Sequence, residues 1–288
     1  MDNEISTFGV REFSKSTSEV DTHVENILSL GYSIVPNVID QTALAPIRAS
    51  LDLTYQKQVD ECGGEDRLAI INDAHTARCP LAYDDLFLDV ARSKPVLSIV
   101  ERLLGEYFVL MLQNGVLNIP DTGNKQNAGY WHRDLNYQHF VSSRPLAISA
   151  LFVIDEFSEL TGATCVLPAS HKSEAFPSDT FVRTNERTIE APAGSALVFD
   201  SMLYHRGSRN RSNGVRRAIN HIYSLPFIKQ QISLPKILNG RFSDDPSLSV
   251  FLGYESESDE NVIAFRMKRI ARINASASKP LSGDGDVK

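Results

Sequence analysis

From Tyr107 onward, the chain consists of short runs of β-branched and aromatic residues that alternate with turn residues. This texture is typical of antiparallel strands in a barrel or sandwich, and Gly162 and Gly194 mark two of the turns. The expected strands are Phe108–Gln113, Gly129–Asp134, Ala147–Ile154, Cys165–Leu167, Arg187–Glu190, Ser195–Phe199 and Ala218–Leu225.

The first third of the chain is mainly helical. Apolar residues at helical spacing predict a helix from Val20 to Leu30, ended by Gly31 and followed by a short strand over Tyr32–Val35. Asp40 is placed to cap a helix over about 41–59, and a further helix is expected over 95–104. Helices followed by many strands indicate a mainly β jelly-roll core (a double-stranded β-helix, cupin-like) with a helical buttress.

The sequence therefore predicts one domain over residues 17–274 between two loose ends. Within it we expect a mainly helical buttress (17–106), a barrel core (107–227) and a C-terminal cap (228–274) that contains a helix near 246–252. Residues 1–16 are expected to be flexible, and residues 275–288 are expected to be disordered because they are mostly Ser, Ala, Gly and Asp.

Composition narrows the class of function. The net charge of −7 argues against a nucleic-acid partner, which usually meets a basic protein face. Three widely spaced cysteines favour a reducing, cytoplasmic location over a disulfide framework. The N-terminus lacks a signal-peptide pattern, and no apolar run is long enough to span a bilayer, so we expect no membrane partner.

Two histidines and one aspartate form the most informative pattern of polar residues. His132 and Asp134 stand two apart on an expected strand, where they would project to the same face, and His205 follows a second strand-like segment. Two imidazoles and one carboxylate suit one face of an octahedral ferrous ion, which leaves positions open for a cosubstrate and O₂. An isolated His-x-Asp is weak evidence by itself, so the second histidine and a following arginine carry much of the argument.

Arg216 lies eleven residues after His205, at the start of an expected strand. A guanidinium can hold a carboxylate by two parallel hydrogen bonds. Strand alternation would put Arg216, Ala218 and Asn220 on one face and Arg217 on the other. A solvent-exposed Arg216–Arg217 pair is the alternative interpretation.

Four segments together resemble the phytanoyl-CoA dioxygenase family of Fe(II)/2-oxoglutarate oxygenases, over roughly residues 20–230. They are the Tyr-Trp-His-Arg-Asp run 130–134, the stretch 161–172 that ends in Pro-Ala-Ser-His-Lys, the run 193–200, and 205–219. The family places Gly where Ala169 stands here, a difference that we expect to be harmless.

The resemblance implies a role for several residues. His132, Asp134 and His205 would bind Fe(II), and Arg216 would bind the distal carboxylate of 2-oxoglutarate. Gln113, Asn118 and Ser208 are further candidates for contacts with the cosubstrate. His171 is expected to be structural.

The resemblance implies an enzyme that decarboxylates 2-oxoglutarate to succinate and CO₂ while it oxidises a substrate with O₂. The aspartate favours hydroxylation or another oxidation over halogenation. The mixed polar and aromatic surroundings favour a compact natural product or metabolite, in biosynthesis, over a long acyl chain. Candidate substrate contacts are Tyr130, Asn136, Tyr137, His139, Phe140 and Tyr204.

Three other readings remain open at this point. A cupin-like metalloenzyme without 2-oxoglutarate would share the histidines but would not need Arg216. A non-catalytic binding barrel would not need intact metal ligands, and a protein hydroxylase would need a peptide groove. The sequence does not identify the substrate, the type of oxidation, the role of residues 228–252 or the oligomeric state, although a homodimer is possible.

Overall fold

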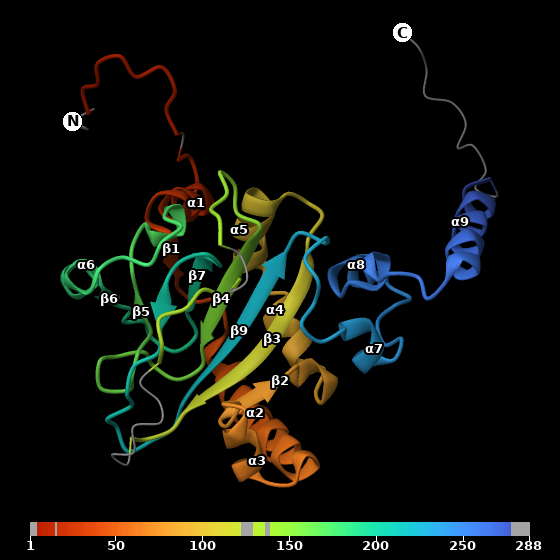
Figure 1. The fold of residues 1–288 in the computed structure, drawn as a ribbon, viewed down its shortest axis with the longest axis horizontal. Coiled ribbons are helices and arrows are strands. Elements are labelled where there is room, and N and C mark those ends of the chain that lie inside the picture. The colour runs from red at the N-terminus through yellow and green to blue at the C-terminus, as the bar shows by residue number, and fades with distance from the viewer. Residues whose placement is uncertain (1–4, 15, 122–128, 136–138, 278–288) are drawn as a thin grey trace. The chain divides into compact units, whose positions relative to one another are not determined.

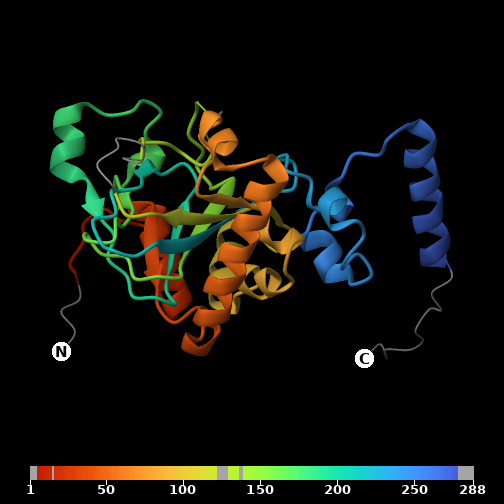
Figure 2. The same cartoon turned by 90° about the horizontal axis from the view of Figure 1, so that it is seen from below.

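The computed structural model describes residues 5–14, 16–121, 129–135 and 139–277. The chain separates into two units, one that ends at Tyr254 and one that begins at Glu255. The first unit carries all the strands and is shown in Figures 1 and 2. The second contains the helix α9 (Val262–Ala277). No helix in the described part of the chain has both the length and the apolar character needed to cross a membrane.

A large antiparallel sheet forms the centre of the first unit. Its strand order is β1-β7-β4-β9-β3-β2, and every neighbouring pair is antiparallel. Figure 1 shows β3, β9 and β4 as the long strands in the middle. The strands are β1 (Tyr32–Val35), β2 (Thr76–Arg78), β3 (Val109–Asn118), β4 (Ala147–Val153), β7 (Ala196–Asp200) and β9 (Arg216–Ser224).

Helices from the first third of the chain cover one face of this sheet. Ile47 and Leu51 of α2 and Ile99 of α5 join the same buried cluster as Phe152 of β4 and Tyr223 of β9. Burial of such side chains stabilises the fold by about 1.5–3 kcal/mol each. The helices are α1 (Glu19–Leu30), α2 (Gln41–Cys62), α3 (Glu65–Ile70), α4 (Leu86–Ala91) and α5 (Lys94–Leu104).

A second sheet lies against the opposite face of the large sheet. It has the order β6-β5-β8, with β6 (Arg187–Thr188), β5 (Cys165–Val166) and β8 (His205–Arg206). Val166 of β5 shares a buried cluster with Val153 and Ala218 of the large sheet. The central strands are thus buried on both faces, which is why all seven residues of β4 are buried.

Short helices complete the described chain. A 3-10 turn over Pro80–Ala82 follows β2, another over Ser170–Lys172 follows β5, and a third covers Tyr254–Ser256. The remaining helices are α6 (Asp179–Asn185), α7 (Leu234–Leu238) and α8 (Pro246–Phe251).

The expected strands over 108–113, 147–154, 165–167, 187–190, 195–199 and 218–225 all occur, with shifted ends. One expected strand is wrong: residues 129–134 form no regular strand, and only His132 makes a β-bridge. The helix α9 is absent from the predicted elements, because within the expected C-terminal cap (228–274) only a helix near 246–252 is predicted. The expected single domain over 17–274, with a disordered tail from 275, remains a prediction.

Candidate metal centre

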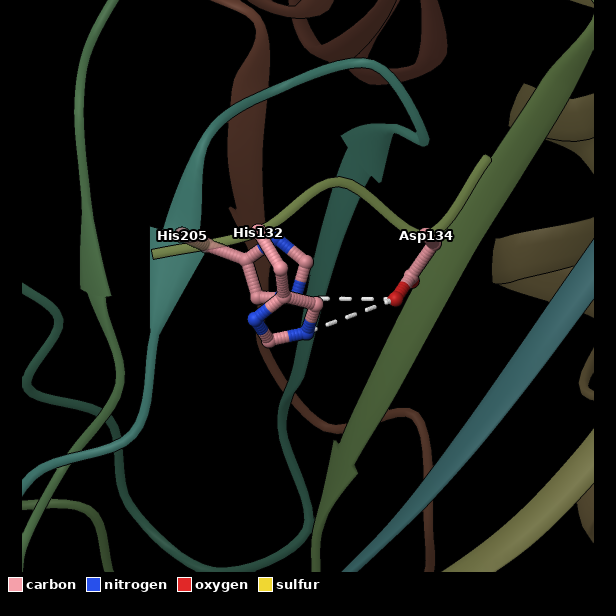
Figure 3. A group of neighbouring side chains, drawn as sticks. All are labelled: His132, Asp134 and His205. Carbon is pink, nitrogen blue, oxygen red and sulfur yellow. Dashed lines mark ion pairs between the residues drawn. The ribbon is translucent and has the colours of Figure 1, made fainter. Parts of the chain in front are cut away.

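His132, Asp134 and His205 converge on one point between the two sheets. The potential ligand atoms of the three side chains all lie within 4.8 Å of one another. Asp134 Oδ1 is 3.6 Å from His205 Nε2 and 3.9 Å from His132 Nε2. Figure 3 shows the two imidazole rings side by side, with the carboxylate across from them.

Backbone hydrogen bonds, rather than a continuous strand, bring these residues together. His132 and His205 donate reciprocally to each other's carbonyl oxygens, both at 3.0 Å. Asp134 N–H donates to the Ser201 carbonyl, also at 3.0 Å. The segment 132–134 is therefore anchored at both ends to the chain that leads from β7 to β8, and the predicted strand alternation is not what aligns its two side chains.

Each histidine is fixed in one tautomer by a carbonyl oxygen. His132 Nδ1 lies 2.8 Å from the Tyr130 carbonyl, and His205 Nδ1 lies 3.1 Å from the Leu203 carbonyl. A carbonyl only accepts, so each Nδ1 carries the proton and each Nε2 offers its lone pair. Metal-binding histidines are commonly oriented in this way, by a hydrogen bond from the ring nitrogen that does not bind the metal.

The charge states also suit a cation. Burial lowers the pKa of His205, and the nearby Asp134 carboxylate opposes this shift only in part. A lowered pKa favours the neutral imidazole, which is the form that binds a metal. Two imidazole nitrogens and one carboxylate oxygen match the donor set of non-haem Fe(II) sites, so these residues fit that metal.

Arg216 is buried on β9 without an ion-pair partner among the described residues. It is 4 % exposed, its Nη2 donates to the Gly162 carbonyl at 3.1 Å, and its guanidinium lies 4.5 Å from the centre of the Phe157 ring. Its Nε has no hydrogen-bond partner in the described structure. Burial lowers the pKa of Arg216 to about 10. A buried cation with an unpaired N–H group is well suited to a carboxylate ligand.

Its neighbour Arg217 points to the opposite face. Arg217 forms a bidentate ion pair with Asp52 of α2, at 2.7 and 2.8 Å, and also pairs with Asp155 at 3.0 Å. Strand alternation thus places Arg216, which has no ion-pair partner among the described residues, and Arg217, which has two, on opposite faces of β9. The sequence predicted these opposite orientations.

Two candidates for cosubstrate contacts, Gln113 and Ser208, have side chains that point away from the three metal ligands. Gln113 is fully buried on the helix-facing side of β3, where it accepts from Leu81 N–H at 2.7 Å and donates to the Phe87 carbonyl at 3.1 Å. Ser208 Oγ lies 3.3 Å from Cys165 Sγ and 3.3 Å from Arg206 Nη1. In the pairing of β5 with β8, Val166 and His205 point toward the large sheet. The adjacent pair, Cys165 and Arg206, therefore points to the opposite face, away from the metal ligands.

Asn118 is better placed than Gln113. It is paired with Arg216 across β3 and β9. Its amide donates to the Gly162 carbonyl, which also accepts from Arg216, and to the Ser208 carbonyl. Asn118 thus lies beside the Arg216 guanidinium and shares its carbonyl acceptor.

The substrate candidates have mixed positions. Tyr130 is 90 % exposed, and His139 and Phe140 are exposed. Tyr204 already contacts protein groups, because the Arg133 guanidinium lies over its ring at 3.9 Å and Phe176 meets the ring edge to face. Asn136 and Tyr137 lie outside the described residues.

Two residues that contact Asp134 are absent from the sites predicted from the sequence. Ser149 Oγ on β4 donates to Asp134 Oδ2 at 2.6 Å, and Asn220 Nδ2 on β9 donates to the same oxygen at 3.3 Å. Alternation from Arg216 had placed Asn220 on the correct face, whereas nothing in the sequence distinguished Ser149.

Comparison with known sequences relates the chain to one family. The profile of the family described as phytanoyl-CoA dioxygenase matches residues 29–218. An uncharacterized protein of Mycobacterium tuberculosis is 34 % identical over 78 % of this chain and 82 % of its own. The dioxygenase cdmD of Talaromyces verruculosus is 24 % identical over 88 % of each chain.

Solved structures show the same fold at low sequence identity. HygX of Streptomyces hygroscopicus, with nickel, 2-oxoglutarate and hygromycin B bound, is 17 % identical, with a TM-score of 0.56 over 74 % of this chain and 90 % of its own. SnoN, an α-ketoglutarate-dependent epimerase from nogalamycin biosynthesis, is 16 % identical, with a TM-score of 0.55 over 72 % and 83 %.

Proposed function

The chain belongs to the phytanoyl-CoA dioxygenase family of Fe(II)/2-oxoglutarate-dependent oxygenases, and from that premise we propose what its own residues do. His132, Asp134 and His205 bind Fe(II), and Arg216 binds the distal carboxylate of 2-oxoglutarate. The enzyme hydroxylates or otherwise oxidises a small-molecule substrate. The observation that carries this proposal is the convergence of the three ligand atoms within 4.8 Å.

When bound, Fe(II) and 2-oxoglutarate supply an oxidant from O₂, with succinate and CO₂ as coproducts. The protein contributes position and charge. The two imidazoles present Nε2 lone pairs because their Nδ1 protons are bound to carbonyls. The Arg216 guanidinium, already out of water, would give a charge-assisted pair with the cosubstrate.

A closed double-stranded β-helix and a single domain over 17–274 belong to the same proposal. The two facing sheets support a closed barrel. The isolated bridges His132–His205 and Phe157–Ala191, which add to the regular strand pairs, also support it. The likeness in fold to HygX and SnoN also supports it.

We further propose a compact natural product or metabolite as the substrate, in a biosynthetic role in the cytoplasm. Three partly buried apolar residues, Leu112, Leu135 and Ile228, pack against a small buried cluster that includes Ile222. Leu135 directly follows the ligand Asp134. Related folds hold hygromycin B in HygX and nogalamycin RO in SnoN, and a molecule of that size range would suit this chain.

The test is an anaerobic titration of metal-free protein with Fe(II) and then 2-oxoglutarate, followed by visible absorption. We expect a weak charge-transfer band that needs both additions. Arg216→Ala should weaken the band at limiting 2-oxoglutarate while iron binding persists, and Asp134→Ala should abolish hydroxylation. Arg217→Ala is the matched control, because its guanidinium is engaged by Asp52 and Asp155 on the other face.

The outcomes separate the alternatives. Iron binding without the band would favour a cupin-like metalloenzyme that does not use 2-oxoglutarate. Failure to bind iron would favour a non-catalytic binding barrel. An equal loss of the band in the Arg216 and Arg217 variants would refute the assigned role of Arg216.

A further inference from the structure

The two oxygens of the Asp134 carboxylate have different surroundings. Oδ1 faces the two imidazoles, at 3.6 Å from His205 and 3.9 Å from His132. Oδ2 faces the sheet, where it accepts from Ser149 Oγ at 2.6 Å and from Asn220 Nδ2 at 3.3 Å. The carboxylate is thus oriented by contacts that involve neither histidine.

The direction of the hydrogen bonds follows from the chemistry of the groups. An ionised carboxylate only accepts, so the single hydroxyl proton of Ser149 is donated to Asp134. The contact of 2.8 Å between Ser149 Oγ and Ser201 Oγ must then be donated by Ser201. Ser201 also accepts from the Asp134 backbone through its carbonyl, so one residue supports both the backbone and the side chain of Asp134.

These donors come from the centre of the large sheet. Ser149 lies on β4 and Asn220 lies on β9, the two middle strands of the large sheet, and these strands are paired with each other in register. Ser149 is fully buried. Hydroxyl and amide groups held in this way cannot easily rotate to follow a moving carboxylate.

We propose that Ser149 and Asn220 are positioning residues that hold Oδ2 of Asp134 and present Oδ1 alone to the metal. The proposal rests on the proposed Fe(II) site. With two donors on Oδ2, Oδ1 would be the oxygen left to a metal held by His132, Asp134 and His205. Without them, the carboxylate can turn about its Cβ–Cγ bond.

The experiment measures Mn(II) affinity in the full-length protein by the EPR signal of the free ion. We compare wild type with Ser149→Ala, Asn220→Ala and the double variant. Each single substitution should weaken Mn(II) binding by about 10–100-fold, the usual effect of losing a group that orients a metal ligand. The double variant should lose less than the product of the two effects, because both groups act on one atom.

Two control substitutions match these variants in chemistry and location. Ser224 is a buried serine on β9 whose hydroxyl has no partner in the described structure, and Asn114 stands opposite Asn220 on β3. Ser224→Ala and Asn114→Ala should keep Mn(II) affinity within about twofold of wild type. The visible spectrum of bound Co(II), which reports coordination, should change in the Ser149 and Asn220 variants and not in the controls.

Each outcome decides a different point. If wild type does not bind Mn(II) or Co(II), the proposed metal site itself is wrong. If wild type binds and both single variants bind within twofold of it with an unchanged Co(II) spectrum, the positioning role is wrong and the metal site stands. If Ser149→Ala fails to fold, Asn220→Ala with its Asn114 control decides the question alone.

Discussion

At the scale of single residues, Arg133 shows how the metal ligands are held. Arg133 lies between His132 and Asp134 in sequence, and it is only 6 % exposed. Its guanidinium donates to the carbonyls of Met202, Ser170, Ser173 and Glu174, and it stacks on the Tyr204 ring. The residue between two ligands therefore fastens their segment to Met202, which precedes β8, and to residues 170–174, which follow β5.

A pH dependence of stability belongs to the same scale. His221 is fully buried, and burial lowers its pKa to about 3. Its Nε2 lies 2.8 Å from the Gln113 amide nitrogen, which can only donate, so His221 must be neutral in the folded protein. In the unfolded chain it would titrate near its ordinary pKa of about 6.5.

Because the pKa is lower in the folded state, the contribution of His221 is complete above pH 6.5 and is lost as the pH falls from there toward 3. Within this range, each unit by which the pH falls should lower the contribution of His221 to the free energy of unfolding by about 1.4 kcal/mol. Urea unfolding at several pH values will test this, and His221→Gln, which keeps an acceptor for Gln113, should have a shallower slope. Identical slopes would contradict the prediction.

At the scale of elements, the end of α1 is linked to the metal centre. Gly31 ends α1 with φ +91°, and its carbonyl accepts from Asp200 N–H at the end of β7. A Cβ at Gly31 would stand 2.6 Å from Leu203 Cδ1 and 2.7 Å from His171 Nδ1. The Leu203 carbonyl in turn orients the ligand His205.

Gly31→Ala should therefore cost both backbone strain and packing. Gly63→Ala is the matched control, since Gly63 also ends a helix, α2, with a positive φ of +82°. A Cβ at Gly63 would stand 3.5 Å from the nearest atom, on the Arg67 side chain, which is an ordinary contact distance. The control should lose about 1–2 kcal/mol of stability from its left-handed backbone, and Gly31→Ala should lose about 1–3 kcal/mol more from overpacking. Urea unfolding measures both, and equal losses would show that the close contacts do not matter.

At the scale of the whole molecule, the large sheet separates two environments. Its helix-covered face carries the main apolar core, and its other face carries the smaller core, the metal ligands and the buried Arg216. Adjacent residues on β9 therefore have unrelated roles, such as Asn220 at the metal ligand and His221 in the helical core. Stability and ligand binding depend on opposite faces of one strand.

The second unit gives the prediction at this scale. It begins at Glu255, whereas all three metal ligands and their hydrogen-bond partners belong to the first unit. Several large apolar residues of α9 are exposed, including Ile263 and Ile273. Deletion of residues 255–288 should leave Mn(II) affinity unchanged, and loss of metal binding would contradict this division of the chain.

The sequence by itself determined what local chemistry can specify. Alternation and turn residues located most strands, helical spacing and caps located α1, α2 and α5, and the spacing of His132, Asp134, His205 and Arg216 indicated the metal site and separated Arg216 from Arg217. All of these signals are local in the chain except the pairing of the His132–Asp134 segment with His205, which follows 71 residues after Asp134.

Only the tertiary structure decided which distant residues meet. Gln113 and Ser208 turned away from the site, while Ser149, 15 residues beyond Asp134, came to hold its carboxylate. The segment 129–134 is aligned by hydrogen bonds to residues near 201–205 rather than by its own strand geometry. Register between strands far apart in the chain sets these contacts, and register depends on the packing of both cores at once.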